Sequence, residues 1–233
     1  MKFKGCRFAL WGSILLVTMI ILLVSVPVKN AKAQEAVTIF TPNSPIPKKF
    51  YKSWSLFLIT SPEWVLPESN DKLKNLYDVF QAFGRAIGPD HVAVWFWSKD
   101  PNLEQYYKAV DVMRSAAFCT KLKLPPSKGP YILVTTEYPG PSILRSPETF
   151  PNELKNFQVI DLNNATASEV IRLLNDLADK LVASDISEID PHSEEYWREW
   201  QRSFEAVKNT IITLSKKITL KIKTGFFEAD IIF

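Results

Sequence analysis

Short apolar runs alternate with amphipathic segments between residues 54 and 183, and this alternation restricts the fold more than any other feature of the sequence. The runs have the length and composition of buried strands, and helix-like segments separate most of them. The four runs are Trp54–Thr60, His91–Ser98, Tyr131–Thr136 and Phe157–Leu162. Strands that alternate with helices pair in parallel, with the helices covering the sheet. We therefore predict an α/β fold in which helices flank a sheet.

Two helices are predicted from apolar residues that recur every three or four positions. The apolar face of the first consists of Leu73, Leu76, Phe80, Phe83 and Ile87. Gly88-Pro89 ends this helix. A second helical stretch begins at Asp100-Pro101, where a capping residue precedes a proline, and continues to about Leu122. Its expected inner face consists of Tyr106, Val110, Met113 and Ala117.

A third helix is predicted after the fourth strand, where Thr166 and Glu169 have the spacing of a capping box. Its buried face consists of Val170, Leu174, Leu177 and Leu181. The overlapping tripeptide Asn164-Ala165-Thr166 also has the pattern of a glycosylation sequon. The bacterial type of leader described below favours the helix cap.

The dipeptide Gly129-Pro130 stands directly before the third predicted strand. Together with the order strand–helix–strand–helix–strand–strand–helix, it makes residues 54–183 resemble the thioredoxin-like superfamily. The resemblance implies a mixed sheet flanked by helices. It also implies that the Gly129–Pro130 peptide bond is cis and lies beside the site at which members of the family bind substrate. Pro130 and Tyr131 are therefore candidate binding residues.

The loop between the first strand and the first helix departs from the family pattern. Redox enzymes of the superfamily carry Cys-x-x-Cys there, whereas this chain has Ser-Pro-Glu-Trp-Val-Leu-Pro-Glu at residues 61–68. Dithiol exchange needs an attacking and a resolving thiol, and Cys119 is the sole cysteine after the leader. The resemblance therefore implies a scaffold without this chemistry. Trp64 is a candidate exposed aromatic for binding in the loop.

Other candidate reactive groups are sparse. Cys119 is a candidate thiol, but it falls late in the second helix, where a cysteine also packs as a small apolar residue. Asp190, His192, Glu194 and Glu195 form an acidic group with one histidine, which is a thin ligand set for a metal. Acidic residues in a first helical turn are explained by the helix dipole. We predict neither a metal site nor a cofactor.

Trp95 and Trp97 alternate along the second strand, so they are expected on one face of the sheet with Phe96 on the other. A buried core explains this pattern, and an aromatic recognition groove is the alternative.

The most regular helical pattern lies after Asp185. Its apolar residues, which we treat as candidate interface residues, are Trp197, Trp200, Phe204, Val207, Ile211, Leu214 and Ile218. This face can pack on the chain's own domain or on the same helix of a second copy. The bulk of Trp197 and Trp200 favours the first arrangement. Residues 218–233 form either a hairpin around Gly225 or a continuation of the helix.

Residues 1–33 have the layout of an export leader. Lys2, Lys4 and Arg7 precede an uncharged run over residues 8–28, and Ala31-Lys32-Ala33 supplies a cleavage site after Pro27. The run is also long enough to remain as a membrane anchor. Residues 34–53 then read as a proline-containing linker, 54–185 as the thioredoxin-like domain and 186–233 as a C-terminal helix and tail.

The numbers of basic and acidic residues indicate which classes of partner the chain can bind. Residues 1–33 hold five basic and no acidic residues, which leaves 23 basic against 25 acidic residues in the remainder. This near-neutral balance does not indicate nucleic-acid binding. We predict an exported, non-catalytic binding or assembly module of the bacterial cell envelope, with a protein partner or a second copy as its ligand. The alternatives are a single-cysteine redox protein, a transferase on the same scaffold, or a periplasmic subunit of a membrane complex.

Overall fold

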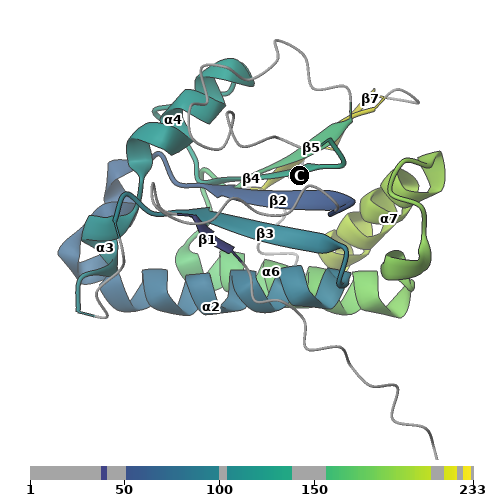
Figure 1. Cartoon of the computed structure of the whole chain (residues 1–233), viewed down its shortest axis with the longest axis horizontal. Helices are drawn as coiled ribbons and strands as arrows, with labels where there is room; N and C mark the ends of the chain where they lie inside the picture. The colour runs from purple at the N-terminus through teal and green to yellow at the C-terminus, as the bar shows by residue number, and fades with distance from the viewer. Residues whose placement is uncertain are drawn as a thin grey trace, which may run out of the picture. The chain divides into compact units, whose positions relative to one another are not determined.

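A mixed sheet of seven strands, in the order β1-β3-β2-β4-β5-β6-β7, runs through the described part of the chain (Figure 1). The computed structural model describes residues 38–40, 51–99, 104–137, 156–210, 218–224 and 228–231. The strands are β1 (Thr38–Phe40), β2 (Ser53–Leu58), β3 (His91–Phe96), β4 (Tyr131–Thr135), β5 (Phe157–Asp161), β6 (Thr219–Lys223) and β7 (Glu228–Ile231). Strand β3 pairs in parallel with β1 and β2, and every later neighbouring pair in the sheet is antiparallel. The predicted α/β class with a mixed sheet is confirmed.

Helices cover both faces of this sheet. The longer helices are α2 (Asn70–Ile87), α4 (Val112–Lys121), α6 (Ala167–Ala183) and α7 (Glu194–Thr210). Helices α2 and α6 lie side by side on one face, and α4 lies on the other (Figure 1). Short turns of helix are α3 (Tyr106–Ala109), η1 (Pro62–Val65), η2 (Pro67–Ser69) and η4 (Ile186–Glu188).

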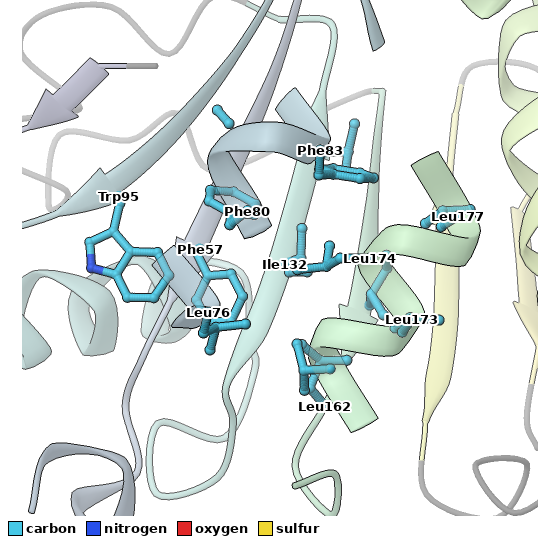
Figure 2. Packing of buried hydrophobic residues seen from close by; sticks show 14 of the residues in the cluster. Phe57, Leu76, Phe80, Phe83, Trp95, Ile132, Leu162, Leu173, Leu174 and Leu177 are labelled. Carbon is cyan, nitrogen blue, oxygen red and sulfur yellow. The ribbon is translucent and has the colours of Figure 1, made fainter. Parts of the chain in front are cut away.

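The strands separate two hydrophobic cores because successive side chains point to opposite faces. The larger core lies against α2, α6 and α7 and contains Phe57 and Trp95, whose rings stack with centroids 4.8 Å apart. Figure 2 shows these two rings with Phe80 and Leu76 of α2. The smaller core lies against α4 and contains Phe96, which stacks on Phe118.

The expected arrangement of the aromatic residues in β3 is confirmed. Trp95 and Trp97 belong to the larger core and Phe96 to the smaller one. All three are at most 1% exposed. These rings therefore form core rather than an open recognition groove.

The continuous helix predicted up to Leu122 is wrong. Between α3 and α4 the chain is extended at Val110, which forms a β-bridge with Trp97. Asp111 then caps α4 by accepting a hydrogen bond from the Arg114 backbone N–H at 3.0 Å. Since α4 thereby turns to the other face of the sheet, Phe118 is buried and Met113 is 81% exposed.

The linker predicted over residues 34–53 contains an edge strand. Strand β1 lies within it and pairs with β3, with Ile39 opposite Trp95. The run Thr38-Ile39-Phe40 combines β-branched and aromatic residues, which favour a strand. Nearby prolines obscured this short run in the sequence.

The C-terminal region continues the same sheet. Helix α7 ends at Thr210, and Ile218 stands just before β6, so the helix predicted to reach Ile218 is wrong. Strands β6 and β7 pair as an antiparallel hairpin, with Lys223 opposite Glu228, which agrees with the hairpin alternative. Apolar and polar residues alternate in β6 at the period of a strand, and the helical spacing at Ile218 is coincidental.

The apolar face of α7 is buried inside the chain itself. Members of the larger core from this region are Trp197, Trp200, Phe204, Val207 and Ile218. The predicted docking of the helix onto its own domain is therefore confirmed for these residues. Ile211 and Leu214 lie outside the described residues.

The predicted leader, residues 1–33, also lies outside the described residues. Among the helices that the structure describes, none has the length and apolar character needed to cross a membrane.

Candidate functional site

A groove of about 390 Å³ opens where the carboxyl ends of β2 and β5 meet the amino ends of α2 and α6. One wall comes from the segment between β2 and α2 and from the first turns of α2. The other comes from the β5–α6 loop and the start of α6. The groove is lined by Glu63, Trp64, Ser69, Lys72, Leu73, Asn163, Asn164, Ala165, Thr166 and Ala167.

The first wall is stiffened by two short helical turns, each beginning with a proline. The Trp64 N–H donates to the Ser61 carbonyl at 3.2 Å, and the Ser69 N–H donates to the Leu66 carbonyl at 2.9 Å. The first turn directs the Trp64 ring onto the larger core, where it is 8% exposed. The prediction that Trp64 is an exposed aromatic is therefore wrong, although the residue does line the groove.

The second wall is fixed by hydrogen bonds at the end of β5. The Leu162 N–H donates to the Pro130 carbonyl at 3.0 Å, and the Ala165 N–H donates to the Leu162 carbonyl at 2.9 Å. The predicted capping box is present, with the Thr166 N–H bonded to Glu169 Oε2 at 2.7 Å. The interpretation of Asn164-Ala165-Thr166 as part of a helix cap is therefore confirmed.

The Gly129–Pro130 peptide bond is cis, as the resemblance predicts. Pro130 is buried, and its carbonyl is occupied by the Leu162 N–H. The Thr60 hydroxyl donates to the Lys128 carbonyl and lies 2.5 Å from the position of a Cβ at Gly129. Pro130 therefore does not line the groove, but its carbonyl holds Leu162, which precedes the second wall.

Tyr131 points away from the groove. It is fully buried in the smaller core, on the α4 side of the sheet. Its hydroxyl donates to the Pro125 carbonyl at 3.1 Å. Of the three candidate binding residues, the structure brings only Trp64 to the wall of the groove.

The groove presents polar groups that are suited to binding. The side chains of Glu63, Lys72 and Asn164 are exposed and make no hydrogen bond or ion pair with other described residues. They offer a carboxylate, an ammonium and an amide to a ligand. The lining contains no cysteine or histidine, and hence no thiol or imidazole for covalent or acid–base catalysis.

Cys119 lies far from this arrangement. It is fully buried in α4 against the smaller core. Burial, with a smaller effect of Asp161, raises the pKa of the Cys119 thiol to about 12. Because the thiolate is the reactive form, the structure places this candidate thiol in an unreactive environment.

The acidic group near His192 forms a turn at the start of α7. Asp190 accepts from the His192 N–H at 3.1 Å, and the Asp190 carbonyl accepts from the Ser193 hydroxyl at 2.6 Å. Across the described residues, no set of three histidine, cysteine or acidic side chains is placed to hold a metal.

His91 is a polar residue whose surroundings the sequence analysis missed. Its Nδ1 lies 2.7 Å from Ser53 Oγ, and its Nε2 lies 2.9 Å from Ser55 Oγ. Burial lowers the pKa of His91 to about 3. A possible signal was the Ser-x-Ser spacing at the start of an apolar strand, which places both hydroxyls on one face of the sheet.

The groove and the His91 environment lie at opposite ends of β2. The groove adjoins the carboxyl end of this strand, and His91 pairs with its first residue, Ser53. These two places are the strongest candidates for function within the described residues. Comparisons with protein-family models, with curated proteins and with solved structures found no match to this chain.

Proposed function

We propose that this chain is a non-catalytic binding or assembly module of thioredoxin-like architecture, exported to the bacterial cell envelope. The observation that carries the proposal is the groove between the β2–α2 and β5–α6 segments. The first of these segments corresponds to the dithiol loop of the superfamily, and here it contributes polar side chains without a thiol.

The order of the central strands supports the thioredoxin-like architecture. Strand β2 pairs in parallel with β3 and antiparallel with β4, and β5 completes the set on the far side of β4. Helix α2 connects two parallel strands, as expected for a β–α–β unit. The buried Pro130 at the start of β4 agrees with the same architecture.

Binding of a protein segment fits the groove better than chemistry does. Glu63 and Lys72 provide opposite charges on one wall, and Asn164 provides an amide on the other. Such groups recognise the peptide bonds and charged side chains of a polypeptide. The buried Trp64 gives this wall a rigid base.

Export is supported by the sequence alone. The leader over residues 1–33 combines a basic start, an apolar run and a cleavage site. A retained leader would tether the module to the membrane, and a cleaved one would release it.

Site-specific photocrosslinking in the native cell tests the proposal. A photoreactive residue at Glu63 should give a defined protein adduct, and the same group at the exposed Met113 of α4 should not. The adduct from Glu63 should weaken when Lys72 is changed to Glu, because the charge pattern of the groove is altered. Equal adducts from both positions, or an adduct insensitive to Lys72→Glu, would contradict binding in the groove.

The single-cysteine redox alternative is disfavoured by the position of Cys119. A redox function requires an accessible thiolate, and this thiol is buried with a raised pKa. Turnover of a disulfide substrate that is abolished by Cys119→Ser would revive this alternative.

A further inference from the structure

The region from α4 to the start of β4 is basic. Residues 112–130 contain four basic and no acidic residues. Three of the four, Lys121, Lys123 and Lys128, form no ion pair with another described residue. Lys123 and Lys128 are exposed, and Lys121 is half-buried. We call these three lysines the basic corner.

Two acidic residues on the same side of the sheet bind other groups. Asp111 is ion-paired with Arg114 at 3.2 Å, where it caps α4. Asp161, whose charge acts on Cys119, accepts a hydrogen bond from the Asn163 N–H at 2.9 Å. Neither carboxylate forms an ion pair with the basic corner, so the positive charge of the corner is available to a partner.

Lys123 occupies a backbone position that favours glycine. The Lys123 N–H donates to the Thr120 carbonyl at 3.2 Å, and the Leu124 N–H donates to the Cys119 carbonyl at 2.8 Å. This is the Schellman arrangement that ends a helix, and Lys123 stands where glycine is usual. Its φ is +57°, which a residue with a Cβ adopts at a cost in stability. A lysine kept at such a position points to a role for its ammonium group in binding.

The loop after α4 gives the basic corner a rigid base. Leu122 and Leu124 pack against the smaller core. The Pro125 carbonyl accepts from the Tyr131 hydroxyl and from the Lys128 N–H, each at 3.1 Å. Because the backbone is already ordered, binding at the corner loses little conformational entropy.

The outer side of α4 adjoins the basic corner and carries an exposed apolar side chain. Met113, Ala117 and Thr120 follow one another at spacings of four and three residues, so they share a face of the helix. Phe118 and Cys119, on the opposite face, are fully buried. Met113 is 81% exposed. A long, flexible apolar side chain beside lysines is suited to entering a lipid headgroup layer.

The helices on the other face of the sheet have the opposite sign of charge. Residues 167–210, which form α6, η4 and α7, contain ten acidic and five basic residues. Helix α4 lies on the other side of the sheet from α2 and α6 (Figure 1). The charge of the chain is therefore polarised across the sheet, and an anionic surface attracts the α4 side.

From these observations we propose that the outer side of α4 and the basic corner dock on the surface of a membrane that contains anionic phospholipid. The lysines lie at the lipid phosphates, and Met113 enters between the headgroups. Each lysine near such a surface enriches the chain about fivefold, so three give roughly a hundredfold. This attraction is weak for a free chain and sufficient to orient one that a retained leader tethers to the membrane.

A lipid surface fits this face better than a folded acidic partner. The three lysines surround no described pocket, since none of them lines the groove or the cavity beside His91. A fluid layer of phosphates needs charge and an apolar side chain, without matching shape. The proposal does not depend on the function of the groove.

Fluorescence quenching by brominated lipid tests the proposal on the full chain, inserted through its leader into vesicles. The vesicles contain phosphatidylcholine alone or with about 30% phosphatidylglycerol. A fluorophore is attached at Met113→Cys in a Cys6→Ser background, because Cys119 is buried. The matched control is Val182→Cys, since Val182 is 51% exposed on α6. The leader tethers the chain equally in both vesicles, so a difference between them reports the surface contact.

The fluorophore at position 113 should be quenched at least twofold more in the anionic vesicles than in the neutral ones. Salt at about 0.5 M should remove this difference by screening. Position 182 should be quenched equally in both vesicles. Equal quenching at position 113 in the two lipid compositions, or stronger quenching at position 182, would overturn the proposal.

Two pairs of substitutions locate the contact. Lys123→Gln with Lys128→Gln should weaken the attraction about 25-fold and reduce quenching at position 113 to its level in neutral vesicles. Lys74→Gln with Lys180→Gln is the matched control, because it removes the same charge from exposed positions of α2 and α6. If the control pair reduces quenching as much as the first pair, net charge is responsible and the proposed surface is wrong.

Lys123→Gly separates binding from folding. Glycine adopts a φ of +57° without the cost of a Cβ, so the midpoint of thermal unfolding should rise. The attraction to anionic vesicles should nevertheless weaken about fivefold. Unchanged quenching at position 113 in this more stable variant would contradict the proposal.

Discussion

Ser53 Oγ lies 2.7 Å from Nδ1 of His91, across the first paired position of β2 and β3. The Ser55 hydroxyl is bonded to the other ring nitrogen, so both nitrogen atoms of the imidazole have a hydrogen-bond partner. The ring lies on the face of the sheet that carries the larger core. A polar side chain can be buried without large cost when its hydrogen bonds are made. This contact explains how His91 begins an otherwise apolar strand.

Stability should fall as the pH is lowered from 6.5 toward 4, because of His91. The pKa of His91 is about 3 in the folded chain against a usual value of 6.5, so the unfolded chain binds the extra proton in this interval. Above pH 6.5 the imidazole is neutral in both states, and His91 leaves the free energy of unfolding unchanged. Below pH 6.5 the free energy of unfolding decreases by about 1.4 kcal/mol per pH unit. Urea unfolding at several pH values measures this slope. His91→Gln should be less stable at pH 7 and show a flatter profile, and parallel profiles would contradict the assignment to His91.

Cys119 should resist thiol reagents in the folded chain. Its thiol is buried and its pKa is raised to about 12, so almost no thiolate exists at pH 8. Labelling in a Cys6→Ser background, read by intact mass, should be slow in buffer and rapid in denaturant. Equally fast labelling under both conditions would show that α4 opens readily or that the thiol is exposed.

Gly84→Ala should destabilise the chain, although alanine normally favours a helix by about 0.5–1 kcal/mol over glycine. A Cβ at Gly84 would lie only 2.5 Å from Cβ of Ala93, where α2 crosses β3. Overpacking of this kind costs about 1–3 kcal/mol. The double variant Gly84→Ala with Ala93→Gly removes the overlap and should regain part of the loss in thermal melting. Additive losses in the double variant would contradict steric contact as the cause.

The framework of the fold could be predicted from the sequence, because each element carries its own local signal. The four apolar runs became β2 to β5, and the periodic residues of α2 and α6 face the larger core. The capping box at Thr166 was also readable, since it depends on residues three apart. Features that depend on contacts between distant segments could not be predicted from the sequence. The break between α3 and α4 depends on the bridge from Val110 to Trp97, and β1 depends on the exposed edge of β3.

The candidate sites were predictable to a smaller extent. The resemblance predicted a site between Pro130 and the loop over residues 61–68. That loop does line the groove, but the other wall is the β5–α6 segment and Pro130 is not in the lining. Burial of Trp64 did not follow, since it is set by the direction of a short helical turn. The environment of His91 requires the register that places Ser53 opposite it and the approach of Tyr196 from α7. Neither is encoded in a local pattern.

Phe204→Ala should destabilise the chain by about 3–5 kcal/mol without changing its oligomeric state. Phe204 is 1% exposed and belongs to the larger core together with residues of α2 and α6, so its removal leaves a cavity inside the same chain. Arg198→Ala is the matched control, because Arg198 is exposed on the same helix and forms an ion pair with Glu194 one turn away. Its effect should stay within about 0.5 kcal/mol. Urea unfolding gives the stability and light scattering gives the mass. A stable Phe204→Ala variant that changes from dimer to monomer would mean that α7 packs between copies and that its burial within one chain is wrong.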